Sequence, residues 1–321
     1  MKRLTLFFDN FKRNESGAVL VLTAASLVVF LGIMALTVDI GALALERNRL
    51  QNACDSAALA AAWELPNVNP TREMAKDYLI MNNVDPNDAA ISISADNTKV
   101  TVEVQRAVEF KFAPVLGINS GTAAGKAVAS YGSISGATGV VPFGIPDQEL
   151  SFGQEYQLKA GSHDDYGPGN YGALALDLRG AQSYLNNLKY GYQGIINVGD
   201  WVETEPGNMS GPTFDGVTYR INSCEHTPKC SIDRYDINCP MVMIVPIYEP
   251  GSLSGRSEVK IVGFGAFLLK GVNGRGNNSR VTGYFLETVP PDGIKYIIDP
   301  DQENYGLRAA KLISKNSMGE I

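Results

Sequence analysis

The stretch Gly17–Val38, GAVLVLTAASLVVFLGIMALTV, contains no charged residue and decides how the chain is organised. As a helix rising 1.5 Å per residue, these 22 residues extend over about 33 Å, which is enough to cross one bilayer core. The helical pattern continues beyond Asp39, because no proline occurs until Pro66. We therefore predict a single transmembrane helix at 17–38 that runs directly into a long external helix at 39–65.

The charges beside the span predict its orientation. Basic residues outnumber acidic ones at 1–16, whereas the first charge after the span is Asp39. Positively charged flanks stay on the cytoplasmic side. We therefore predict a single-pass protein of the cell membrane, with a cytoplasmic tail at 1–16 and an extracytoplasmic C-terminal part. The alternative is a cleaved signal peptide, but its apolar core would span only about 7–15 residues.

Two features of the helical stretch are candidate functional positions. Asp39 is expected at the outer membrane interface as a hydrated carboxylate that marks the end of the span. Ala53, Ala57 and Ala61 recur at every fourth position and share one helix face. Small side chains let helices approach closely. We predict that this face mediates association with neighbouring subunits, including homo-oligomers; the alternative is packing on its own domain.

The external part is acidic and rich in turn residues. The whole chain has 27 basic and 34 acidic residues, and acidic residues exceed basic ones by nine once 1–16 is left out. This balance argues against nucleic acid as a partner, because nucleic acids bind basic patches. The 33 glycines and 16 prolines, with 45% hydrophobic residues, indicate a turn-rich β domain that buries a core.

Beyond the external helix the chain divides into two parts. A helix at 71–82 and a hairpin over 91–104 predict a small α+β module at 66–131. A Gly/Ser stretch at 132–139 predicts a linker. The segment 140–321 is expected to form a β-rich sandwich or barrel, so that the fold class is α+β overall. Its predicted elements are strands at 155–158, 173–178, 194–198, 217–221, 241–248, 259–269 and 281–289, and a helix at 181–190.

The N-terminal motifs carry a resemblance. Ser16-Gly17-Ala18-Val19 opens the span, Val38-Asp39-Ile40-Gly41 closes it, and RLQNACDSAALA follows at 49–60. In these features 15–62 resembles the N-terminal domain of TadG-like proteins of the Tad (Flp, tight adherence) pilus-assembly system. Two departures are Cys54, where a small apolar residue is usual, and the lack of a downstream D-x-S-x-S metal motif.

The resemblance implies a non-catalytic, membrane-anchored component of a pilus-assembly or surface-adhesion apparatus. Its expected partners are the lipid bilayer and pilins or other pilus-assembly subunits. A glycine before an apolar helix also resembles class III prepilin-peptidase substrates, which carry a glutamate five residues after the cut. Leu22 stands at that position, so we expect an uncleaved anchor. A processed minor pilin, or an anchored ligand-binding or adhesion module unrelated to pilus assembly, are the alternatives.

Residue types needed for catalysis are sparse. The chain has two histidines, His163 and His226, and a Ser-His-Asp or Cys-His site must use one of them. Ser162-His163-Asp164-Asp165 is interpreted as a solvated turn, and Asp164, Asp165 and Asp177 lack the alternating spacing of a calcium loop. Motifs of serine hydrolases, zinc peptidases and phosphate-binding loops are absent. We therefore predict that the chain is not an enzyme.

Cys224, His226, Cys230 and Cys239 form the strongest local cluster. Three cysteines and a histidine make a tetrahedral ligand set, but C-x-H-x3-C-x8-C is not a standard zinc spacing. Outside the cytoplasm, one disulfide among the three cysteines competes with a metal. We expect the disulfide and no cofactor, with a structural zinc as the alternative. Either the disulfide or the zinc ion would cross-link the loop that precedes the strand predicted at 241–248.

Overall fold

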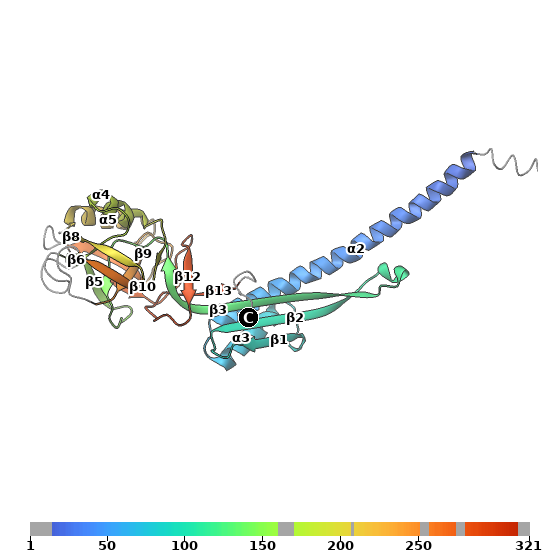
Figure 1. Cartoon of the computed structure of the whole chain (residues 1–321), viewed down its shortest axis with the longest axis horizontal. Coiled ribbons are helices and arrows are strands. Elements are labelled where there is room, and N and C mark those ends of the chain that lie inside the picture. The colour runs from blue at the N-terminus through green and yellow to red at the C-terminus, as the bar shows by residue number, and fades with distance from the viewer. Residues whose placement is uncertain (1–14, 160–169, 207–208, 251–256, 274–279, 314–321) are drawn as a thin grey trace, which may run out of the picture. The chain divides into compact units, whose positions relative to one another are not determined.

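The computed structural model describes residues 15–159, 170–206, 209–250, 257–273 and 280–313 (Figure 1). The chain forms two compact units. The first runs to Ala129 and includes the segment from Leu312, and the second runs from Ser130 to Lys311. The α+β class with a β-rich C-terminal part is confirmed.

The described part of the chain begins with helices and continues mainly with strands. The helices are α2 (Glu15–Ala62), α3 (Val68–Met81), α4 (Ala181–Tyr190) and α5 (Ser210–Asn222), with 3-10 helices η1 (Pro86–Asp88) and η2 (Ala113–Leu116). The strands are β1 (Ala89–Ile93), β2 (Lys99–Glu109), β3 (Ser120–Ala137), β4 (Ile145–Pro146), β5 (Glu155–Lys159), β6 (Asn170–Ala175), β7 (Ile196–Asn197), β8 (Trp201–Pro206), β9 (Val242–Tyr248), β10 (Glu258–Asn273), β11 (Arg280–Leu286), β12 (Tyr296–Asp299) and β13 (Arg308–Leu312).

The helix α2 is continuous over 48 residues, as the absence of proline predicts. Its N-terminal part, including Val19, Phe30 and Val38, exposes large apolar side chains. By length and composition this helix can cross a membrane. Its C-terminal part instead packs against α3 and β2 (Figure 1). One helix therefore combines an exposed apolar half with a half that belongs to a folded domain.

A hairpin and α3 complete the first unit. β1 pairs with β2 in antiparallel register, from Ala89 opposite Val104 to Ile93 opposite Val100, which confirms the predicted hairpin. Alternate β2 residues, Val100, Val102 and Val104, are fully buried, as expected for a strand with one covered face. α3 contributes a buried stripe that includes Leu79 and confirms the predicted short helix.

The alanine face of α2 packs inside the first unit. Ala53, Ala57 and Ala61 are all completely buried by the chain itself. The approach of the helix to β3 is very close, because a Cβ on Gly125 would lie 2.6 Å from the carbonyl carbon of Leu50. The prediction that this alanine face mediates association between subunits is therefore wrong. Small residues are needed here because they bring the helix backbone onto its own sheet and α3.

We expect Ala57→Leu to destabilise the first unit, because the larger side chain has no space against α3 and β2. Overpacking of a close-packed core costs about 1–3 kcal/mol of unfolding free energy. Denaturation of the full-length protein in detergent measures this loss. Ala44→Leu on the exposed face of the same helix is the matched control and should leave the unfolding midpoint nearly unchanged. Equal midpoints for the two variants would contradict the packing described here.

The second unit is built around β9 and β10. Its main sheet has the order β4-β9-β10-β11-β5, β8 also pairs with β10, and β6 pairs with β8. Pairing is antiparallel except between β4 and β9. Every residue of β9 is buried, and so is the stretch Gly263–Leu269 of β10, so both faces of the sheet centre are covered. α4 and α5 pack together, and α5 also packs on β10 (Figure 1).

The segment predicted as a linker is instead part of a strand. Residues 132–137 belong to β3, and Ser133–Ala137 pair with β12. A Cβ on Gly132 would lie 2.7 Å from the backbone of Asp299. The small residues of this stretch therefore permit a close backbone approach, which is a second use of glycine in strands besides flexibility.

The prediction of a strand at 217–221 is also wrong, because these residues lie in the helix α5. The buried residues of this stretch, Thr213, Gly216, Val217 and Arg220, follow helical spacing. A Cβ on Gly216 would lie 2.5 Å from the Leu188 side chain of α4. The glycine serves close packing between two helices, which local alternation does not reveal.

Candidate functional site

Asp39 lies where the exposed half of α2 meets the first unit. Its side chain is only 3% exposed, so the prediction of a hydrated carboxylate is wrong. Oδ1 accepts a hydrogen bond from the backbone N–H of Lys111 at 2.8 Å, and Oδ2 accepts from Phe112 at 2.9 Å and Ala113 at 2.6 Å. These N–H groups belong to Ala113, the first residue of η2, and to the two residues before it, and a helix leaves the backbone donors at this end without internal partners. Asp39 therefore caps η2 and fastens the β2–β3 hairpin to α2.

The hairpin tip held by Asp39 exposes several apolar side chains. Phe112 and Ile118 are about half exposed and Val115 is 91% exposed. The hairpin extends along α2, with its tip toward the N-terminal part of the helix (Figure 1). The cap thus places an apolar loop next to the residue that ends the uncharged stretch of α2.

The cysteine and histidine cluster lies between α5 and β9, in the second unit. The ligand atoms of Cys224, His226, Cys230 and Cys239 all lie within 4.8 Å of one another. Nδ1 of His226 is 3.6 Å from Sγ of Cys224 and 3.4 Å from Sγ of Cys230. The three cysteines are buried, and the four cysteines of the chain are free in the structure. The disulfide expected from the sequence is therefore not formed there.

The surroundings of the cluster favour a thiolate at one position. Burial raises the pKa of Cys224, but the backbone N–H groups of Cys230 and His226, with the His226 ring, outweigh it and lower the pKa to about 6. Burial and the neighbouring thiols raise the pKa of Cys239 to about 12. Three thiols this close cannot all ionise by themselves, because like charges repel. The nearby thiolate of Cys224 also raises the pKa of His226.

The first unit carries a family signature in its helix. Residues 17–64 match the family Tad, described as putative Flp pilus-assembly TadE/G-like. The chain carries a TadE/G-like domain. No curated protein and no solved structure matches the chain. The TadE/G-like match covers the exposed apolar half of α2, Asp39 and the buried alanine face, and it ends just after α2.

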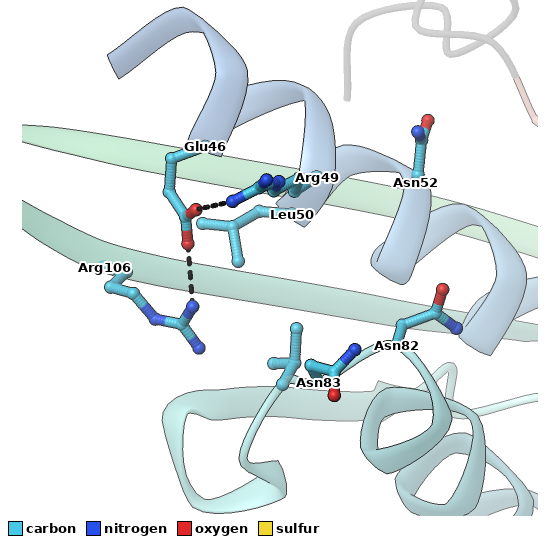
Figure 2. A pocket seen from close by; sticks show the side chains of 8 residues that line it. Glu46, Arg49, Leu50, Asn52, Asn82, Asn83 and Arg106 are labelled. Carbon is cyan, nitrogen blue, oxygen red and sulfur yellow. Dashed lines mark hydrogen bonds and ion pairs between the residues drawn. The ribbon is translucent and has the colours of Figure 1, made fainter. Parts of the chain in front are cut away.

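A polar pocket of about 550 Å³ lies beside the TadE/G-like helix (Figure 2). Glu46 lines the pocket, with one oxygen 2.7 Å from Nη1 of Arg106 on β2 and the other 3.8 Å from Nη1 of Arg49. The lining residues are Glu46, Arg49, Leu50, Asn52, Asn82, Asn83, Val84 and Arg106. This lining combines charged side chains with amides, and the ion pair between Glu46 and Arg106 joins α2 to β2.

Sequence reasoning missed this pocket because it combines α2, β2 and the loop after α3, which lie far apart along the chain. It also missed the partners of Asp39, since nothing local connects residue 39 with 111–113. The residues Ser162, His163, Asp164 and Asp165 lie outside the described residues. Asp177, the third carboxylate considered for calcium, accepts hydrogen bonds from Ser183 and, at 3.0 Å, from Asn187.

We expect Asp39→Asn to loosen the hairpin tip. Asparagine replaces one carboxylate oxygen with an NH₂ group, which is a donor. The atom at that position can therefore no longer accept hydrogen bonds from the backbone N–H groups at the start of η2. Loss of hydrogen bonds to a buried carboxylate costs about 1–3 kcal/mol. Hydrogen exchange of the amides of 111–113 should accelerate in the full-length protein, and this measures the loss locally. Asp77→Asn, an exposed position on α3, is the control. Unchanged exchange in Asp39→Asn would contradict the capping role.

Proposed function

We propose that the protein is a membrane-anchored, non-catalytic component of a Tad/Flp pilus-assembly apparatus. The observation that carries this proposal is the coincidence of two features in one segment. Residues 17–64 match the TadE/G-like family, and the same residues form a helix with an exposed apolar half. The second half of the helix is buried in a folded unit, so the domain holds the anchor rigidly.

The anchor is proposed to cross the membrane once, with the N-terminus in the cytoplasm. Lys2, Arg3, Lys12 and Arg13 precede the apolar half, and their charge favours the cytoplasmic side. Both folded units then lie outside the cytoplasm, where pilins and other assembly subunits are the proposed contacts. The non-catalytic role is supported by the match of residues 17–64 to a family described by pilus assembly.

A processed minor pilin is the second candidate. The observation in its favour is that the apolar half of α2 is exposed along its length and begins beside Gly17, where prepilin peptidases cut such segments. Cleavage there would free an amine at Ala18, and Leu22 offers it no carboxylate. An uncompensated charge inside a fibre is costly, which favours the uncleaved anchor.

Deletion of the gene in its native host is expected to abolish surface pili while the major pilin remains at its normal level. Pili are counted by electron microscopy, and re-expression of the intact chain is the control. Normal piliation in the deletion strain would contradict the pilus role. The intact mass of protein purified from native membranes distinguishes the two candidates. A chain that retains residues 1–17 supports the uncleaved anchor, whereas a chain beginning at Ala18 would replace it with the minor pilin.

The apolar hairpin tip is proposed to rest in the outer membrane interface. Asp39 fastens this tip to α2 directly after the uncharged stretch Gly17–Val38, and a span of about 33 Å ends at the same place. Exposed Phe112, Val115 and Ile118 are then covered by lipid instead of water. Burial of apolar surface contributes roughly 25 cal/mol per Å².

We expect a tryptophan at position 115 to contact lipid. The two natural tryptophans are first removed by Trp63→Phe and Trp201→Phe. The tryptophan fluorescence of Val115→Trp in this background should then be quenched strongly when the protein is reconstituted in vesicles that contain brominated lipids. Met81→Trp, which replaces another exposed apolar side chain of the same unit on α3, should be quenched much less. Equal quenching at the two positions would contradict the membrane placement of the tip.

A further inference from the structure

The segment between α5 and β9 is mostly exposed and has little regular structure. Residues 223–241 contain only turns, bends and the isolated bridge between Ser231 and Arg234. Cys224, Cys230 and Cys239 nevertheless belong to the main hydrophobic core of the second unit. Because few backbone hydrogen bonds hold this segment, its fixed path needs another cross-link. We propose that one structural Zn²⁺ ion, bound by Cys224, His226, Cys230 and Cys239, supplies it.

The spacing of the ligand atoms fits a tetrahedral zinc site. With Zn–S near 2.3 Å and Zn–N near 2.0–2.1 Å, a tetrahedral angle separates sulfur and nitrogen by about 3.6 Å. The Nδ1 atom of His226 lies 3.6 Å from Sγ of Cys224 and 3.4 Å from Sγ of Cys230. The Sγ of Cys239 lies within 4.8 Å of all three other atoms. The four atoms are therefore close enough to converge on one ion with small movements of the side chains.

Neighbouring groups orient the ligands as a metal site requires. The Nε2 atom of His226 is 3.4 Å from Oδ2 of Asp236, so the ring can place its proton on Nε2 and leave Nδ1 for the metal. Backbone N–H groups of Cys230 and His226 point at the sulfur of Cys224, and that of Met241 points at the sulfur of Cys239. Such donors stabilise the negative charge that thiolate ligands carry.

A buried arginine ties the cluster to the helices. Arg220 of α5 donates hydrogen bonds to the carbonyl oxygen of Leu188 on α4 and, at 2.8 Å, to that of Pro240 next to Cys239. The last ligand is thereby held against the α4–α5 pair before β9 begins. The site would therefore connect α5 and β9 through the metal as well as through the core.

The ligand set identifies the class of metal and its role. Thiolates select soft or borderline ions, and three sulfurs with one imidazole in a tetrahedron suit Zn²⁺. Four protein ligands fill the coordination sphere and leave no position for water or substrate, so the site is structural. Zn²⁺ also balances two of the three thiolate charges, which removes the repulsion among ionised thiols. Bound thiolates are protected from disulfide formation outside the cytoplasm.

The first test is metal analysis of the full-length protein purified from membranes in detergent without added metal. Elemental mass spectrometry should find one zinc per chain. Thiol alkylation should modify none of Cys224, Cys230 and Cys239 until a chelator is added. X-ray absorption should show three sulfur neighbours near 2.3 Å and one nitrogen near 2.0 Å. Removal of zinc should lower the unfolding temperature, and ZnCl₂ should restore it, because the metal binds only the folded segment.

Variants distinguish the loss of a zinc ligand from the general effect of removing a buried thiol. Cys239→Ser should lose zinc, whereas Cys54→Ser, which removes the other buried cysteine outside the cluster, should retain it. His226→Gln should lose zinc and His226→Cys should retain it, because cysteine restores a fourth ligand. Asp236→Asn removes no ligand and should weaken zinc binding by about 10–100-fold in a chelator competition.

Three results would overturn the proposal. The first is a disulfide between any two of the three cluster cysteines in zinc-free protein from native membranes. The second is stoichiometric zinc in Cys239→Ser, which would place the ion elsewhere. The third is copper or iron in place of zinc in protein from native membranes. Since the measurements are made on the intact wild-type chain as well as on variants, a variant that fails to fold does not decide the outcome. Loss of the pilus role alone would leave these results unaffected.

Discussion

The close approach of α2 to its own sheet is the constraint on which the first unit depends. Alanines at 53, 57 and 61 are completely buried, and the backbone at Leu50 lies so near β3 that Gly125 has no room for a Cβ. A helix this close cannot slide or rotate against the sheet without steric conflict. Its exposed half therefore leaves the domain in a fixed direction within that unit. The ion pair between Glu46 and Arg106 and the cap at Asp39 reinforce the same contact.

The position of Asp39 links this packing to the proposed membrane anchor. A carboxylate at the end of an apolar helix would be hydrated if the helix stood alone. Here three backbone N–H groups replace water, and the charge is used to fix the hairpin tip instead. The exposed Phe112, Val115 and Ile118 then extend the apolar surface of the anchor sideways. A helix and a loop that meet the same interface would resist tilting more than a helix alone.

In the second unit, the segment between α5 and β9 is held by interactions of a different kind. The sheet centre of this unit is buried on both faces, but the path from α5 to β9 has no strand or helix and enters the core mainly through its cysteines. Buried cysteines, the Arg220 hydrogen bonds to two carbonyl groups and the proposed zinc would together hold this path. A closed coordination sphere adds rigidity and no reactivity. This agrees with the proposed role of the unit, which is to present surfaces to partner subunits outside the cytoplasm.

The sequence by itself determined the features that depend on neighbouring residues. The uncharged stretch Gly17–Val38 and the proline-free continuation predicted α2, and β1 and β2 followed from alternation, because these periodic patterns are local. The tertiary structure decided what those elements contact. The alanine face could serve a partner or the chain itself, the glycines at 132 and 136 could bend or pack, and Asp39 could face water or N–H donors. Each choice depends on residues far away in sequence, such as Ala113 for Asp39. For Cys224, His226, Cys230 and Cys239, the ligand types were visible but their convergence was not, since only the folded path around Arg220 brings the four atoms together.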